Sequence, residues 1–163
     1  MIRRLDASDA AAYRRIRLDA LRWHPEAFGS SYEEEAEYAL DDFRRHLAPP
    51  GCVFGVGAGD RLVGIAGLYV QTRRKHRHKG TVVGVYVEAG HRRGGTAQRL
   101  VEAVIAQARQ QELRLLQLTV TVGNDSARRL YSRLGFQSFG IERRALLVEG
   151  VFYDEELMVL DLA

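Results

Sequence analysis

The chain has 163 residues, of which 46% are hydrophobic and 28% charged, and its formal net charge is +3. This length suits one domain, so we expect a single domain over residues 1–163, and the composition excludes disordered and fibrous proteins. No apolar run approaches the roughly 18 residues that cross a membrane, and no signal peptide is recognised, so we expect a cytoplasmic protein without a membrane partner. The single cysteine, Cys52, excludes an internal disulfide and a thiolate-rich zinc site.

The basic residues are almost all arginine, because only Lys75 and Lys79 among the 24 are lysine. Arginine suits phosphate binding, but this small net charge does not by itself indicate a nucleic-acid-binding protein. Residues 73–79 form a basic turn without an acidic residue, which we expect at an exposed hairpin tip, although it could contact RNA or an acidic partner. His76 and His78 within it have no nearby third ligand, so no metal site is predicted.

The order of predicted elements, β-α-α-β-β-β-α-β-α-β-β, indicates a mixed α/β sheet and not a pure Rossmann fold. Strands are recognised by β-branched and apolar runs, and helices by apolar residues at i, i+3 and i+4. We expect strands over residues 1–5, 52–58, 61–71, 81–87, 115–122, 136–147 and 152–161, and helices over residues 8–22, 32–47, 97–108 and 126–134. The run Thr81 to Val87 is β-branched on both faces, so we expect this strand to be buried on both sides.

The strongest local signal is the junction between the strand ending at Val87 and the helix after it. The segment Arg92-Arg93-Gly94-Gly95-Thr96-Ala97 opens that helix with two glycines. Such a turn exposes backbone N–H groups at the positive end of the helix dipole, which is a ready phosphate site, and glycine lets a phosphate approach the backbone. The segment matches neither GxGxxG nor a Walker sequence, so nicotinamide cofactors and ATP are not predicted. Taken alone, it also fits an ordinary helix start.

Two motifs occur in order along the chain: R-x-x-G-x-A at residues 92–97, and N-x-x-A-x-x-L-Y-x-x-x-G-F at residues 124–136. Together they resemble the acyl-CoA-binding motif and the following motif of the GNAT superfamily of N-acetyltransferases. The predicted order of elements matches that fold along nearly the whole chain. The resemblance implies a GNAT-type fold, with a central mixed twisted sheet flanked by helices, and an acetyl-CoA-dependent N-acetyltransferase.

The resemblance also implies a donor site. The pyrophosphate of acetyl-CoA would lie on the glycine turn, and the pantetheine arm would pair along the strand before it, where a backbone amide would polarise the thioester carbonyl. Asn124 matches a position that contacts the cofactor arm, and Tyr131 matches a tyrosine that acts as general acid near the sulfur; without the motif, Tyr131 would fit a core position. The implied donor-site residues are Val85, Tyr86, Val87, Arg92, Arg93, Gly94, Gly95, Thr96, Ala97, Asn124 and Tyr131.

The chain departs from the family's pattern at two places. Ala89 stands where many members have proline, a change that the phosphate cradle can survive. Some members carry a glutamate within the central strand as general base, but residues 81–87 contain no carboxylate and Glu88 comes only at the strand's end, so no base is carried over. Amide formation from a thioester requires no covalent nucleophile, so we expect direct transfer in a ternary complex, with Cys52 in a structural role.

Weaker signals concern the acceptor. Residues 23–38 are aromatic and acidic, and in the resembling fold the link between the first two helices helps to form the acceptor pocket. Carboxylates there would attract a cationic amine, although glutamates also favour the first turn of a helix. The predicted substrate contacts are Phe28, Tyr32, Glu33, Tyr153 and Asp154.

We therefore predict an N-acetyltransferase that acts on a primary amine of a small molecule or a protein. The alternative is a non-catalytic acyl-CoA-binding regulatory module, which would not need Tyr131 as an acid. An RNA-binding domain that uses residues 73–79 is a further alternative, but the chain lacks an RNP-type aromatic signature. The sequence leaves open the identity of the acceptor and the oligomeric state, including a homodimer.

Overall fold

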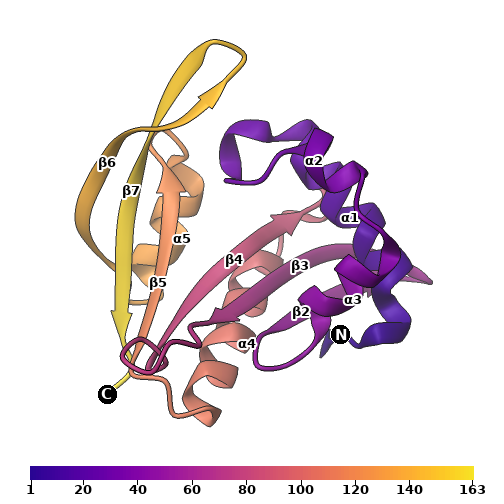
Figure 1. Cartoon of the computed structure of the whole chain (residues 1–163), viewed down its shortest axis with the longest axis horizontal. Coiled ribbons are helices and arrows are strands. Elements are labelled where there is room, and N and C mark those ends of the chain that lie inside the picture. The colour runs from indigo at the N-terminus through magenta and orange to yellow at the C-terminus, as the bar shows by residue number, and fades with distance from the viewer.

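The computed structural model describes residues 1–163, and it is organised around a seven-stranded sheet with the order β1-β2-β3-β4-β5-β7-β6 (Figure 1). All neighbouring strands are antiparallel except β4 and β5, which are parallel. The predicted mixed α/β fold is confirmed.

The strands are β1 (Ile2–Arg4), β2 (Cys52–Ala58), β3 (Arg61–Val70), β4 (Lys79–Val87), β5 (Leu115–Thr121), β6 (Gln137–Val148) and β7 (Val151–Asp161). The helices are α1 (Ala10–Trp23), α2 (Tyr32–Ala36), α3 (Leu40–Leu47), α4 (Thr96–Gln110) and α5 (Asp125–Arg133), with 3-10 turns η1 (Ala7–Asp9), η2 (Pro25–Ala27) and η3 (Ala89–His91).

The helices pack on the sheet through two separate apolar cores. One core joins α4 and α5 to the sheet, and the other joins α1 and α3 to it. Because successive side chains of a strand point to opposite faces, the neighbouring residues Ile65 and Ala66 of β3 enter different cores. The two helix groups therefore cover opposite faces of the sheet.

The predicted single helix over residues 32–47 is wrong, since α2 ends at Ala36 and α3 begins at Leu40. Both helices are held by α1, where Glu35 binds Arg17 and Phe43 packs against Tyr13. Arg17 and Tyr13 are four residues apart, about 6 Å along α1, whereas eight residues of an unbroken helix would span about 12 Å. The break between the helices brings both contacts within reach of α1.

The parallel strands β4 and β5 part soon after they begin (Figure 1). Their pairing is limited to residues 79–81 of β4 against residues 115–117 of β5. The strand over residues 81–87 was expected to be buried on both sides, but the structure contradicts this, because Val83 is 42% exposed. Val82 and Val87 do enter the core that joins α4 and α5 to the sheet, whereas Val83 lines an opening in the sheet.

The basic turn extends into β4, because Lys79 is the first residue of that strand, while residues 72–78 are exposed as expected for a hairpin tip. None of the helices is both long enough and apolar enough to cross a membrane.

Candidate active site

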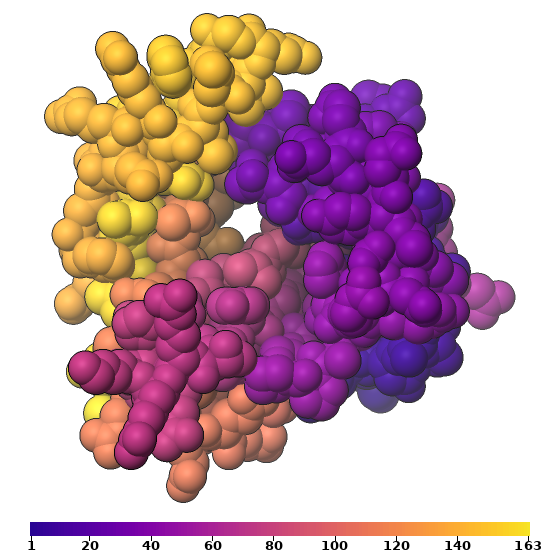
Figure 2. All heavy atoms as spheres, in the orientation of Figure 1, coloured from indigo at the N-terminus to yellow at the C-terminus, as the bar shows by residue number.

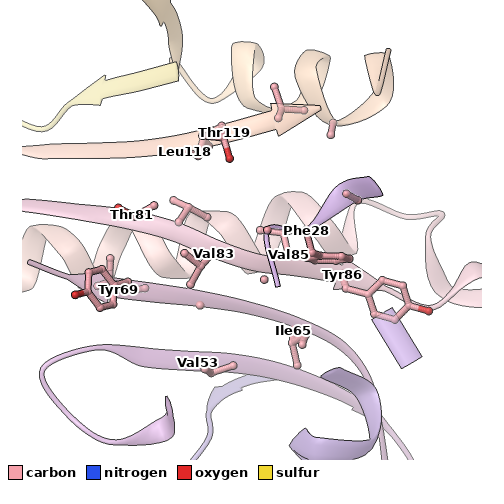
Figure 3. A pocket seen from close by; sticks show the side chains of 18 of the residues that line it. Phe28, Val53, Ile65, Tyr69, Thr81, Val83, Val85, Tyr86, Leu118 and Thr119 are labelled. Atoms are coloured by element: carbon pink, nitrogen blue, oxygen red, sulfur yellow. The ribbon is translucent and has the colours of Figure 1, made fainter. Parts of the chain in front are cut away.

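The gap between β4 and β5 opens into a cleft of about 1420 Å³. Figure 2 shows a hollow in this region, between the C-terminal hairpin and the N-terminal helices. Figure 3 shows the side chain of Thr119 on β5 pointing across the gap toward β4. The cleft reaches both faces of the sheet, because residues of α1, α4 and α5 all contribute to its lining.

The wall formed by β4 is an unpaired strand edge. Val85, Tyr86 and Val87, which are predicted donor-site residues, line the cleft, and no residue of β4 after Thr81 pairs with β5. The pairing with β3 shifts register between Ile65 and Gly67, where a bulge places Gly84 at a φ of 60°. An extended ligand along this edge would find backbone donors and acceptors as a neighbouring strand does.

The glycine turn leads from β4 into α4. Gly94 and Gly95 have φ values of 89° and 74°, and Gly95 is the N-cap of the helix. The first hydrogen bond of α4 runs from the N–H of Arg99 to the carbonyl of Gly95, so the N–H groups of residues 96–98 have no partner within the helix. No atom lies within 4 Å of the position that a Cβ of Gly94 would occupy. The turn therefore offers open backbone donors to an anion.

The six predicted turn residues take different places. Arg92, Gly95 and Ala97 line the cleft, whereas Arg93, Gly94 and Thr96 do not. The guanidinium of Arg92 is already engaged, since its Nε donates to the carbonyl of Val87 at 2.8 Å and its Nη2 lies 3.0 Å from His24 Nε2. This arginine joins the end of β4 to the end of α1 and so holds the turn in place.

Helix α5 supplies the opposite wall. Asn124 caps the helix by accepting a hydrogen bond from the N–H of Ala127 at 3.3 Å, and Tyr131 packs edge-on against Phe136 with ring centroids 5.9 Å apart. Both Asn124 and Tyr131 line the cleft. Burial raises the pKa of Tyr131 to about 12, so its phenol stays protonated at neutral pH and can act as a hydrogen-bond donor.

The predicted acceptor contacts are only partly brought together. Phe28 and Tyr153 line the cleft, while Tyr32, Glu33 and Asp154 do not. Because side chains alternate along β7, Tyr153 and Asp154 face opposite sides of the sheet. The carboxylate of Asp154 instead accepts a hydrogen bond from the N–H of Arg144 at 2.8 Å and ties the β6–β7 hairpin together.

The charged residues of the cleft lining that sequence reasoning missed include Arg17, Glu35 and Glu155. The alternation along β7 gives Glu155 the same face as Tyr153, a signal that could have identified it. It pairs in register with Thr121, whose Oγ1 donates to the carbonyl of Glu26 at 2.6 Å and joins β5 to η2. No local pattern distinguishes Glu35 from the neighbouring glutamates of its helix.

Glu88, at the end of β4, is an ion-pair partner and not a free base. Its Oε1 lies 3.0 Å from Arg15 and 2.7 Å from Arg61, and the residue is absent from the cleft lining. Burial alone would raise the pKa of Glu88, but the hydrogen bonds from Arg61 and Arg15 outweigh burial and lower it. The carboxylate of Glu88 is therefore ionised and engaged by the two arginines.

Comparison with known proteins adds independent findings. Residues 17–136 match the model of the acetyltransferase (GNAT) family. The curated mycothiol acetyltransferase of Actinosynnema mirum is 29% identical over 128 residues, which cover 78% of this chain and 41% of that protein. The chain thus spans less than half the length of that relative.

Solved structures of acetyltransferases share the fold. A ribosomal-protein-alanine N-acetyltransferase from Brucella melitensis has a TM-score of 0.81 and 22% identity, covering 99% of both chains. A putative acetyltransferase from Salmonella typhimurium, determined with its cofactor acetyl-CoA, has a TM-score of 0.84 and 21% identity, covering 100% of this chain and 94% of that one. A phosphinothricin acetyltransferase from Sinorhizobium meliloti, in complex with acetyl-CoA, has a TM-score of 0.85 and 18% identity, covering 100% and 88%.

The ion pairs of Glu88 predict a pH dependence of stability. Its pKa is lower in the folded protein than its ordinary value of 4.5, so the stabilisation is present above that value and is lost as the pH falls through the folded pKa. We expect the free energy of unfolding, measured by urea titration at several pH values below about 5, to fall more steeply in the wild type than in Glu88→Gln. Glu37→Gln, which removes an exposed carboxylate, should keep the wild-type slope. Equal slopes for Glu88→Gln and the wild type would contradict the role of the ion pairs.

Proposed function

The chain belongs to the acetyltransferase (GNAT) family, and from this premise we propose that it transfers the acetyl group of acetyl-CoA to a primary amine, directly and within a ternary complex. On this proposal the protein is an acetyl-CoA-dependent acetyltransferase, in agreement with its family. The observation that carries the finer proposal is the cleft itself, which has an open strand edge, a glycine turn and a buried phenol on its walls.

The donor half of the cleft fits the chemistry of acetyl-CoA. The pantetheine arm is extended and carries amides, which suit the unpaired edge of β4. The pyrophosphate suits the open N–H groups at the start of α4, where glycine leaves room for phosphate oxygens. We propose that the arm runs from the turn along Val85–Val87, so that the thioester lies between β4 and Tyr131.

Transfer then requires three groups from the chain. A backbone N–H of β4 would donate to the thioester oxygen and stabilise the negative charge that develops when the amine nitrogen attacks the carbonyl carbon. As the carbon–sulfur bond breaks, Tyr131 would donate its hydroxyl hydrogen to the leaving sulfur. The amine must lose a proton, and Glu155 is the cleft-lining carboxylate on the β7 side that could take it, directly or through water.

Cys52 is not suited to act as a covalent nucleophile. Its side chain is buried in the core that joins α4 to the sheet, and burial raises the pKa of the thiol. Because the thiolate is the reactive form, this environment makes the residue inert and supports direct transfer.

The cofactor site is tested by Gly95→Glu. In the wild type, acetyl-CoA at about 100 times its dissociation constant should stabilise the fold by about 2.7 kcal/mol and raise the Tm by about 5–10 °C. The carboxylate of Gly95→Glu would block and repel the pyrophosphate, so the shift should vanish. Gly59→Glu is the matched control, because Gly59 also has a positive φ but lies in the β2–β3 turn. A wild type without any shift would overturn the cofactor assignment.

Direct transfer is tested by steady-state kinetics. Double-reciprocal lines should intersect, and no burst of CoA should precede addition of the acceptor, because no acetyl-enzyme forms. Cys52→Ala should keep substantial activity, since only a buried sulfur is removed. An acetyl group found on Cys52 by mass spectrometry would contradict the mechanism.

The role of Tyr131 is tested by Tyr131→Phe. The ring still packs against Phe136, so the fold should persist, but kcat should fall by about 10²- to 10⁴-fold if the hydroxyl acts as general acid. The thermal shift with acetyl-CoA should remain, and the loss in kcat should shrink with acyl donors whose thiols are more acidic. An unchanged kcat, with chemistry shown to be rate-limiting, would return Tyr131 to a packing role and leave water or another group as the acid.

A further inference from the structure

The acceptor side of the cleft contains a buried ion pair between Arg17 of α1 and Glu35 of α2. Nε of Arg17 donates to Oε1 at 3.1 Å and Nη2 donates to Oε2 at 2.8 Å. The side chains are only 12% and 3% exposed. This two-pronged contact uses one edge of the guanidinium and fixes its plane.

The other nitrogen of the guanidinium is free. Nη1 of Arg17 takes part in no hydrogen bond, and it lies 3.1 Å from the point that a Cβ of Gly84 would occupy. Gly84 is the bulge residue of β4 and lines the cleft, as do Arg17 and Phe28. The ring of Phe28 covers the guanidinium at 5.6 Å from its centroid. A fixed, cationic N–H group therefore faces the cleft beside the strand edge.

Stability alone does not account for this arrangement. A buried ion pair is often no more stabilising than apolar residues of similar volume. An anion in the cleft could take the place of water as the acceptor for Nη1 and would form a charge-assisted hydrogen bond with it. Glu35 would keep the guanidinium in position without competing for Nη1.

We propose that the acceptor is a free α-amino acid, whose carboxylate accepts a hydrogen bond from Nη1 of Arg17 while its amine faces the thioester. This inference rests on the proposed function, because it identifies the amine that the same cleft would acetylate. In an α-amino acid the amine and the carboxylate are attached to the same carbon. An anion site beside β4 would therefore hold the amine near the thioester, which we place along the same strand. Glu155 on the β7 side and the apolar side chains of Phe28 and Val83 complete a cleft for a zwitterion with an apolar side chain.

The test compares matched acceptors by CoA thiol release: L-methionine, L-methioninamide and 3-(methylthio)propylamine, together with L-phenylalanine, its amide and phenethylamine. They are compared at equal concentrations of unprotonated amine, because the neighbouring group changes the pKa of the amine. We expect kcat/KM of the wild type to be at least about 10-fold higher for the acid than for the amide or the simple amine, which corresponds to one charge-assisted hydrogen bond.

Variants assign that preference to the guanidinium. The double variant Arg17→Met with Glu35→Met removes both charges, so no unpaired charge stays buried. Its kcat/KM for the acid should be about equal to that for the amide. Arg17→Lys should also lose most of the preference, because its single nitrogen would be taken by Glu35. Arg14→Met is the control, since Arg14 lies on the same helix but outside the cleft lining, and it should keep the wild-type preference.

The outcomes separate this inference from the proposed function. Equal kcat/KM for acid, amide and amine would overturn the role of Arg17 while acetyl transfer stands. Amides that react as well as acids, with simple amines poorer, would indicate a peptide N-terminus and would also overturn it. A preference that survives in the double variant would contradict the assigned residue. Acetylation of no amine at all would overturn the proposed function and this inference with it.

Discussion

The parting of β4 from β5 is the constraint on which the whole site depends. Two parallel strands in the middle of a sheet ordinarily exchange hydrogen bonds along their length, but here the exchange ends at Thr81. The bulge at Gly84, at a φ that other residues adopt only at a cost, re-aims the strand beyond that point. An extended ligand with amides can then take the place of the missing strand, and the glycine turn that we propose for the pyrophosphate follows the end of β4.

Sequence analysis predicted those segments whose conformation is fixed by neighbours in the chain. The turn at Gly94 and Gly95 and the stripe that carries Tyr131 on α5 both depend on local conformation, so their motifs were sufficient. The break between α2 and α3 depends instead on two contacts with α1, which no local pattern contains. Tyr153 and Asp154 could have been separated from the sequence. Adjacent side chains of a strand point to opposite faces of the sheet, so the two residues cannot both face the cleft.

The same distinction explains the acceptor side. Arg17 and Glu35 are 18 residues apart and meet only because α2 folds back on α1. In the sequence, Glu35 stands among three other acidic residues within five positions and carries no sign of its burial. Charge in this segment led to the prediction of an acceptor region there, but the residue that turns inward is selected by tertiary packing.

The two halves of the cleft are built from different parts of the polypeptide. The proposed donor half is formed largely by main-chain groups of β4 and of the turn before α4, whereas the proposed acceptor half is formed by side chains of α1, α2, the segment around Phe28 and β7. Main-chain groups are retained through most substitutions, while side chains are replaced one at a time. A lineage with this architecture can exchange one acceptor for another in small steps and keep its acyl donor throughout. Similarity of fold between two such proteins therefore indicates a shared donor more reliably than a shared acceptor.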